Sequence, residues 1–382
     1  MEVPFHRPYI TEEEIEGVIE SLRAGWLTMG PKTIQFERAF GEYVGAPQAV
    51  AVNSCTAALH LALRAIGLQP GDEVLVPTTT FVASAEVVGY FGARPVLVDI
   101  EPETHLMDVR KMEEKITPRT RAVIPVHYGG QPCDMDEIMA LAEQHRLAVI
   151  EDAAHSLPAW YKGRIIGNIG HITAFSFYAT KTLATGEGGM ATTAREDWAD
   201  QMRVLRLHGI SKDAWKRYTA AGSWRYDVIE NGYKYNTTDL NAALGLAQLR
   251  KVEWMWQERK RIARRYDAAF AGEKGLIPYQ VKSDRVSAWH LYPLRLRLEA
   301  LTIDRDAVAE ALKARGVSIS VHFIPLYHFS YYRRNGYSAE GYPQSEWVFE
   351  RTLSLPIFPG MRDEEIDYVI EAVLSILRSA YR

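Results

Sequence analysis

The chain has 382 residues, 47% of them apolar and 24% charged, and its formal net charge is −4. This composition is ordinary for a globular protein, and the absence of a basic surplus argues against a nucleic-acid-binding protein. Two cysteines, Cys55 and Cys133, make neither a disulfide framework nor a four-ligand metal site, so we expect no metal and a reduced, cytoplasmic location. The segment from Met1 to Glu14 lacks the apolar core of a signal peptide, and no apolar run is long enough to span a membrane.

The first part of the chain predicts three helices. Thr11 and Glu14 have the spacing of a capping box, which starts a helix that ends near residue 24. After a turn-rich connector, a second helix runs to about residue 44. The third opens at residues 53–59 and is apolar nearly all round, which is typical of a buried helix.

Short buried strands, separated by helical patterns, follow along the chain. We expect strands at residues 74–77, 95–99, 122–126, 149–152, 172–177 and 190–193. Repeated alternation of strands and helices favours an α/β fold with a mostly parallel sheet and helices on both faces. We assign this pattern, with an N-terminal arm and a long linking helix, to a large domain of residues 1–255.

The region from His208 to Tyr235 breaks the pattern and reads as a long irregular loop. Its basic and aromatic residues suit a ligand that carries both charge and rings, such as a nucleotide diphosphate. A simple surface excursion between helices is the alternative. The residues concerned are Lys212, Trp215, Arg217, Tyr218, Trp224, Arg225 and Tyr226.

The rest of the chain predicts a smaller α/β unit of residues 256–382. Asp239 is expected to cap the long helix that leads into it. Leucines at 294, 296 and 298 alternate with arginines, which indicates a half-exposed strand. A helix at 304–315, a strand at 317–323 and an amphipathic helix capped by Asp363 complete the expected elements.

A lysine near the middle of the chain is the first candidate catalytic residue. Lys181 lies between the run Ser176–Thr180 and the cluster Gly186–Gly189, where a dry pocket would lower its pKa and make its amine nucleophilic. Taken alone, Lys181 fits a surface lysine at a strand end better than a catalytic one. Asp152 supplies the second observation, because an acid at the carboxyl end of an α/β strand lies where ligands bind. A lysine paired with such an acid is what pyridoxal 5′-phosphate (PLP) requires.

The start of the third helix offers a site for a phosphate group. The helix N-terminus presents unpaired amides and a positive dipole end, with the hydroxyls of Ser54 and Thr56 beside them. An ordinary Asn or Ser cap on a core helix is the alternative.

With these residues in view, the chain resembles the sugar-nucleotide aminotransferases of the DegT/DnrJ/EryC1/StrS family. The resemblance extends from Trp26 to Gly360, and its most specific blocks are Glu151–His155, Ser176–Lys181 and Gly232–Leu240. It implies fold type I of the PLP-dependent transferases. That fold has a large domain with a mostly parallel sheet flanked by helices, and a smaller C-terminal α/β domain.

The resemblance also implies roles for individual residues. Lys181 matches the lysine that holds PLP covalently, and Asp152 matches the acid on the pyridine nitrogen. His155 matches the residue near the ring oxygen. Phe81 matches an aromatic residue stacked on the ring, with core packing as the alternative. The remaining cofactor contacts are Thr56, Ala57 and Ser176 for the phosphate, and Asn236 for the phosphate of the neighbouring subunit; His322 matches, more weakly, a substrate-side residue.

The implied reaction moves an amino group from an amino-acid donor, usually glutamate in this family, to a nucleotide-linked keto-sugar. The amino-sugar formed would enter surface-polysaccharide or secondary-metabolite biosynthesis. The match also implies a homodimer with shared active sites, in which Asn236 serves the neighbouring subunit. The alternative is that Asn236 only stabilises its own loop. The crowding of Trp254, Met255 and Trp256 on one helix is independent support for an interface.

The same residues also bear on competing activities. A dehydratase branch of the family carries histidine at the position of Lys181, and iron–sulfur branches need more than the two cysteines present. A cysteine desulfurase needs a mobile catalytic cysteine, whereas Cys55 falls in the expected phosphate helix. A non-catalytic PLP-binding regulator is the remaining alternative, although it has no need for Lys181 together with Asp152.

Overall fold

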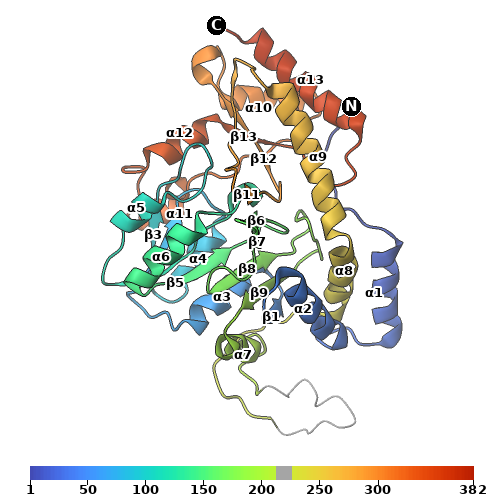
Figure 1. Ribbon diagram of the computed structural model, residues 1–382, viewed down its shortest axis with the longest axis vertical. Coiled ribbons are helices and arrows are strands. Elements are labelled where there is room, and N and C mark those ends of the chain that lie inside the picture. Colours follow the sequence, from blue (N-terminus) through green and yellow to red (C-terminus); the bar gives the residue numbers. More distant parts are fainter. Residues whose placement is uncertain (212–225) are drawn as a thin grey trace.

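The computed structural model describes residues 1–211 and 226–382 and is built around a seven-stranded sheet with helices on both faces (Figure 1). The strand order is β1-β9-β8-β5-β4-β2-β3. Neighbouring strands from β8 to β3 pair in parallel, while β9 runs antiparallel to both β8 and β1. The bounds are β1 Gln48–Val52, β2 Glu73–Pro77, β3 Arg94–Val98, β4 Thr120–Val123, β5 Ala148–Asp152, β8 Ile172–Ser176 and β9 Gly189–Thr193. The predicted mostly parallel sheet is confirmed, and β1 is an additional strand that the sequence analysis did not predict.

Two apolar cores lie on opposite faces of this sheet because successive strand side chains point to opposite sides. Leu75, Val149 and Phe175 belong to the core that also contains residues of α2 and α6, whereas Val74 and Ile150 belong to the core under α3 and α4. The helices of this part are α1 Glu12–Ala24, α2 Pro31–Val44, α3 Cys55–Ala65, α4 Ala83–Gly89, α5 Val109–Glu114, α6 Met135–His145 and α7 Glu196–Leu205. None of the helices in the described ranges is long and apolar enough to cross a membrane.

The capping box predicted for α1 is present, with the amide and the hydroxyl of Thr11 both donating to Glu14 Oε2, at 2.7 and 2.8 Å. The long helix predicted after Asp239 is instead two helices, α8 Asp239–Arg250 and α9 Val252–Phe270. Asp239 does not cap α8, because Thr238 is the N-cap and accepts from the Asn241 amide at 3.2 Å. The carboxylate of Asp239 accepts from the amides of Gly30 at 2.8 Å and Thr33 at 2.9 Å, and therefore holds the start of α2.

The C-terminal unit has a three-stranded antiparallel sheet of order β10-β12-β13, covered by α9, α10 and α13 (Figure 1). Its bounds are β10 Leu276–Ile277, β12 Tyr292–Leu296, β13 Thr352–Leu355, α10 Arg305–Ala314, α11 Ser330–Arg334, α12 Pro343–Arg351 and α13 Asp363–Ser379. The strand predicted here is present as β12, but the prediction that it is half-exposed was wrong, because all of its residues are buried. Arg295 is 2% exposed because its guanidinium donates to the carbonyls of Pro102 and Pro278.

The predicted strand at 317–323 was also wrong, since within the described ranges that segment makes isolated bridges, Val3 with Val317 and Ser320 with Ser354, and no strand. Val3, which the sequence analysis assigned to the large domain, packs into the C-terminal core. The residues against which α9 packs also change along its length. Met255 belongs to the core of the large sheet, and Ile262 belongs to the C-terminal core. We propose the boundary between the two units at this part of α9.

A small third sheet of order β11-β6-β7 joins distant parts of the chain, with β11 Arg285–Val286 paired to β6 Trp160–Tyr161, which also pairs with β7 Arg164–Ile165. It brings the segment before β12 against the large domain. Six of the seven basic and aromatic residues of the predicted nucleotide loop, from Lys212 to Arg225, lie outside the described residues.

Candidate active site

The predicted catalytic residues meet at the carboxyl edge of the large sheet, where α/β proteins place ligands. Asp152 is the last residue of β5, and β8 beside it ends at Ser176, five residues before Lys181. The amide of Lys181 donates to the Tyr178 carbonyl at 2.8 Å, which closes a tight turn after β8. The sheet order therefore brings the lysine and the acid together although they are 29 residues apart (181 − 152).

Lys181 has the altered basicity that the sequence analysis expected. Burial lowers the pKa of Lys181 to about 8, against the opposing effects of Cys55 and Asp152. Arg259, on α9, lowers it further through its positive charge. Roughly a tenth of the amine is consequently unprotonated and nucleophilic at pH 7, far more than for an ordinary lysine.

The Asp152 carboxylate is buried, 6% exposed, and both of its oxygens are held. Oδ2 accepts from the Ser84 hydroxyl at 2.7 Å, and Oδ1 accepts from the Ala154 amide at 3.1 Å. The preceding acid, Glu151, points to the other face of the strand, where it binds His127 Nε2 at 2.9 Å. The two neighbouring acids therefore occupy separate environments.

His155 lies on an aromatic stack beside the lysine. Its ring is nearly parallel to that of Phe323, with centroids 5.8 Å apart and an interplanar angle of 14°. Its Nδ1 accepts from the Gly129 amide at 3.3 Å. Burial, followed by the charge of Lys181, holds the pKa of His155 well below its usual range, so the ring is neutral.

The predicted phosphate cradle is the start of α3. Ser54 is the N-cap, and its hydroxyl accepts from the Ala57 amide at 3.1 Å, so a phosphate contact at Ala57 requires that amide to be shared. Thr56 precedes it in the same first turn. Gly189 lies so close that a Cβ there would stand 2.4 Å from the Ser54 carbonyl carbon, which explains a glycine at this position.

Two further predicted contacts lie near this cradle. Ser176 ends β8, and its hydroxyl accepts from the Tyr178 amide at 3.4 Å. Asn236 pairs with Val52 at the end of β1, and the adjacent Asn53 amide donates to the Tyr235 carbonyl at 2.8 Å. The Oδ1 of Asn236 is buried without a hydrogen-bond partner among the described residues. Asn236 therefore lies beside the phosphate helix of its own chain, with an acceptor atom uncommitted.

Phe81 and His322 come from two separate segments of the chain. Phe81 follows β2 and is 59% exposed, which excludes the alternative of core packing. His322 stacks on Phe5 with centroids 5.6 Å apart, and its Nδ1 is 2.9 Å from Ser354 Oγ. The ring of His322 contacts that of Phe323, centroids 5.0 Å apart, and Phe323 stacks on His155. Burial, followed by the charge of Lys181, lowers the pKa of His322 to about 4.

Four residues that surround the lysine or the acid were not predicted from sequence. They are Ser84, which holds Asp152; His290, whose Nε2 is 3.5 Å from Lys181 Nζ; and Arg259 and His6, whose electrostatic partners include Lys181. No motif marks them, since they come from α4, the segment before β12, α9 and the N-terminal arm. Only the folded arrangement brings them together.

The chemistry of this set fits PLP. An amine of lowered pKa is suited to the aldehyde carbon, a buried carboxylate to the ring nitrogen, and a helix N-terminus to the phosphate. The exposed ring of Phe81 and the stacked ring of His155 supply flat surfaces for an aromatic cofactor.

Comparison with known proteins agrees with this arrangement. The family model of the DegT/DnrJ/EryC1/StrS aminotransferase family matches residues 8–374. The spore coat polysaccharide biosynthesis protein SpsC of Bacillus subtilis is 51% identical over 380 residues, covering 99% of this chain and 98% of SpsC.

Two solved structures are also similar over almost the whole chain. The putative sugar aminotransferase Spr1654 from Streptococcus pneumoniae, in its pyridoxamine phosphate (PMP) form, has a TM-score of 0.93 at 38% identity, with 99% of each chain covered. A PLP form of the same protein matches with a TM-score of 0.92. Helicobacter pylori PseC, an aminotransferase of pseudoaminic acid biosynthesis, has a TM-score of 0.93 at 27% identity, covering 99% of this chain and 100% of PseC.

The family resemblance and the fold expected from sequence are thus confirmed. The chain belongs to the DegT/DnrJ/EryC1/StrS aminotransferase family and is a PLP-dependent sugar aminotransferase.

Proposed function

We propose that this enzyme moves an amino group from glutamate to a nucleotide-linked keto-sugar, with Lys181 and Asp152 as its catalytic residues. The observation that carries the proposal is the meeting of a lysine of lowered pKa with a buried, doubly hydrogen-bonded carboxylate at one sheet edge. The relatives support the sugar class, since SpsC is named for spore coat polysaccharide and PseC for pseudoaminic acid biosynthesis.

PLP, when bound, supplies the electron sink for the carbon that exchanges its amino group. Lys181 would hold the cofactor until the donor amine replaces it. The freed amine then carries the proton taken from the donor's α-carbon, a task for which a pKa of about 8 is well matched near neutral pH. Asp152 would keep the pyridine nitrogen protonated, because an ionised carboxylate stabilises the adjacent positive charge.

We propose that the remaining predicted residues bind rather than react. Thr56, Ala57 and Ser176 would hold the cofactor phosphate, and Phe81 and His155 would lie against its ring. His322 would face the sugar substrate, since it shares the site with Lys181 yet binds Ser354 in the C-terminal unit. The predicted cytoplasmic location remains a prediction.

We also propose a homodimer in which Asn236 reaches the phosphate site of the partner. The side-chain Nδ2 of Asn236 supports this, because it donates one hydrogen to the Thr237 carbonyl at 3.0 Å and carries a second hydrogen of the kind that a phosphate oxygen accepts. The tryptophan crowding on α9 supports it less than the sequence suggested. Trp254 is 42% exposed, but Met255 and Trp256 are buried within the chain.

The proposed activity is tested with a panel of nucleotide-linked 3-keto and 4-keto sugars, with glutamate as the donor. The expected result is formation of one amino-sugar together with an equal amount of 2-oxoglutarate. Loss of water from the sugar without net amination would indicate the dehydratase. A protein that binds PLP but releases no 2-oxoglutarate from glutamate would indicate the regulator. A Lys181→Ala variant is the control for background transfer.

A further inference from the structure

The side chain of His290 is a polar neighbour of Lys181. No sequence motif identifies His290. Its Nε2 lies 3.5 Å from Lys181 Nζ, and its ring centroid is 4.4 Å from that of His155. The residue is 7% exposed. Among the described residues its Nδ1 has no hydrogen-bond partner, so the contact with the lysine is the polar contact of this ring.

We propose that His290 is a positioning residue for Lys181, accepting a hydrogen bond from the lysine ammonium at Nε2 and holding Nζ beside Asp152. The proposal rests on the role proposed above for Lys181. His290 would keep the amine in place before the cofactor binds and again after the donor has displaced the lysine from the cofactor.

The backbone around His290 is fixed on the large-domain side by a glycine turn. The Ala288 amide donates to the Gly130 carbonyl at 3.0 Å, and the Leu291 amide donates to the Gly129 carbonyl at 3.2 Å. Gly130 has φ +102, and a Cβ there would stand 2.9 Å from Ala288 Cβ and 3.0 Å from the Trp289 nitrogen. Only glycine allows the two segments to approach this closely.

A buried cation fixes the same segment from the other side. The Nη1 of Arg259 donates to the carbonyls of His290 at 3.3 Å and Ile357 at 2.7 Å. Arg259 is fully buried, and a rigid guanidinium that bridges two carbonyls restrains both. The imidazole is therefore carried on a peptide whose position is determined by groups other than the lysine.

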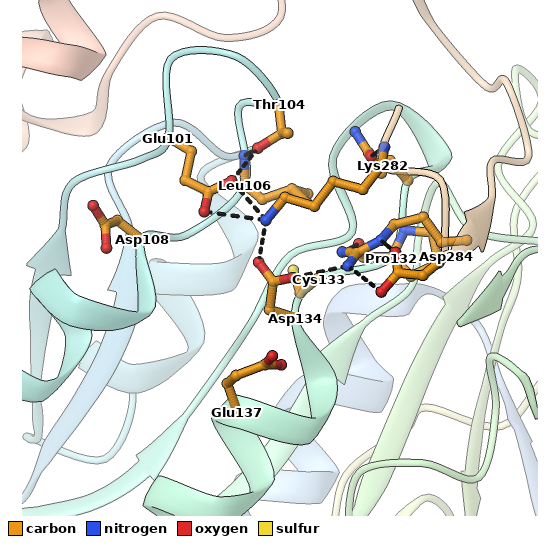
Figure 2. A network of polar contacts seen from close by, with 12 residues as sticks. Glu101, Thr104, Leu106, Asp108, Pro132, Cys133, Asp134, Glu137, Lys282 and Asp284 are labelled. Carbon is orange, nitrogen blue, oxygen red and sulfur yellow. Dashed lines mark hydrogen bonds and ion pairs between the residues drawn. The ribbon is translucent and has the colours of Figure 1, made fainter. Parts of the chain in front are cut away.

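Figure 2 shows a third anchor, a few residues before His290. Lys282 Nζ donates to Asp134 Oδ2 at 2.6 Å and to Glu101 Oε1 at 3.1 Å. Arg285 Nη2 donates to Asp134 Oδ1 at 2.8 Å, and its Nη1 donates to the Pro132 carbonyl at 2.8 Å. These contacts tie the segment that leads to His290 to the large domain, which carries Lys181.

The protonation state of His290 suits an acceptor. Burial, and then the charge of Lys181, hold the pKa of His290 well below its usual range, so the ring is neutral near pH 7. A neutral imidazole accepts at one nitrogen, and Nε2 is the nitrogen next to the lysine. A hydrogen bond to the charged form of a group raises its pKa, so this contact favours the lysine ammonium.

Other titratable groups also act on this lysine and must stay constant in a test. They are Cys55 and Asp152, which raise the pKa of Lys181; Arg259, which lowers it; and His6, His155 and His322, whose own pKa values the lysine charge lowers. Substitutions confined to position 290 leave all of them in place.

The test uses the full-length protein without cofactor, in which Lys181 is reductively methylated over a range of pH and quantified by peptide mass spectrometry. The wild-type midpoint is expected at about 8. His290→Phe removes the acceptor, and the midpoint should fall by about one pH unit, the size expected for one hydrogen bond to a charged group. His290→Gln keeps an acceptor oxygen on a side chain of similar reach, and its midpoint should stay near that of the wild type.

Two outcomes would overturn the proposal. One is an unchanged midpoint in a folded His290→Phe protein, and the other is an equal shift in the Phe and Gln variants, which would mean that packing alone is responsible. If the Phe variant does not fold, His290→Asn replaces it, because its shorter amide does not reach Nζ. The measurement needs neither cofactor nor sugar, so failure of the proposed function in the sugar assay is distinguishable from failure here.

Discussion

The hydroxyl of Ser84 donates a 2.7 Å hydrogen bond to Oδ2 of Asp152, while the Ala154 amide holds Oδ1 at 3.1 Å. The acid at the end of β5 is thus oriented by a side chain from α4 and by the loop that follows its own strand. Both bonds fix the orientation of the carboxylate that we propose lies beside the protonated pyridine nitrogen.

Replacing Asp152 with Asn should therefore leave PLP bound but reduce the transfer rate by about 10²-fold or more, as expected for loss of a charged catalytic partner. Steady-state kinetics with glutamate and the accepted sugar measure the effect. Ser84→Ala is the matched control and should cost less, about tenfold, because the charge remains and only its orientation is loosened. A near-normal rate for Asp152→Asn would mean that the acid is only structural.

Glu151, one residue earlier, should affect the stability of the fold and not the transfer rate. It is fully buried, and it accepts from the Gly170 amide and the Thr173 hydroxyl, both at 2.7 Å, as well as binding His127. Glu151→Gln should lower the free energy of unfolding by about 3 kcal/mol, since it breaks a buried pair, while the folded fraction keeps its transfer rate. Urea unfolding together with kinetics separates the two acids.

The contribution of Glu151 should also depend on pH. Burial by itself raises the pKa of Glu151, but the bonds from His127, Gly170 and Thr173 outweigh burial and lower it. A carboxyl group with a lowered folded-state pKa stabilises the fold above its unfolded pKa and loses that contribution as the pH falls through its folded pKa. The stability difference between wild type and Glu151→Gln should accordingly shrink in acid. A difference that grows in acid would contradict this sign.

The anchors in Figure 2 should differ in strength because they differ in burial. The Arg285 side chain is 1% exposed and that of Lys282 is 32% exposed. Arg285→Met should cost about 3 kcal/mol of unfolding free energy, because Asp134 and the Pro132 carbonyl lose a buried partner. Lys282→Met should cost about 1 kcal/mol or less, since water screens the pair. Equal losses in urea unfolding would contradict this ranking.

Assembly is tested by complementation between two inactive variants. If Asn236 serves the partner's site, a dimer of one Lys181→Ala chain and one Asn236→Ala chain has one pocket with both defects and one with neither. Mixing the two proteins under conditions of subunit exchange should therefore restore activity, with each parent alone as the control. An inactive mixture after verified exchange would exclude a shared site. Full activity of a monomer, shown by light scattering, would exclude it as well.

Much of the fold was predictable from sequence because local patterns determine it. The capping box of Thr11 and Glu14 formed as expected, and the apolar runs formed parallel strands. The failures were long-range. Asp239 has the residue type of a cap, but its carboxylate holds α2 instead of α8. The alternating pattern predicts an exposed Arg295, but its guanidinium is buried and donates to carbonyls from two other segments.

The candidate site also contains residues that local patterns predict and residues that only long-range contacts bring together. Asp152 ends a strand and Lys181 follows one. Both were predicted from sequence motifs and from the rule that α/β sheets bind ligands at the carboxyl ends of their strands. His290 and Arg259 come from segments about 80 to 110 residues later in the chain, without local signals (259 − 181 and 290 − 181). Their proximity to the lysine depends on the glycine turn and the ionic anchors, which no periodicity reveals.

The most direct test of the central assignment is to locate the lysine that binds the cofactor. The PLP-loaded protein is reduced with borohydride, which makes the carbon–nitrogen bond between lysine and cofactor permanent, and the peptides are mapped by mass spectrometry. A phosphopyridoxyl group is expected on Lys181, and the Lys181→Ala protein should have neither this adduct nor measurable turnover. An adduct on a different lysine of the wild-type chain, or a Lys181→Ala protein that still transfers the amino group, would contradict it.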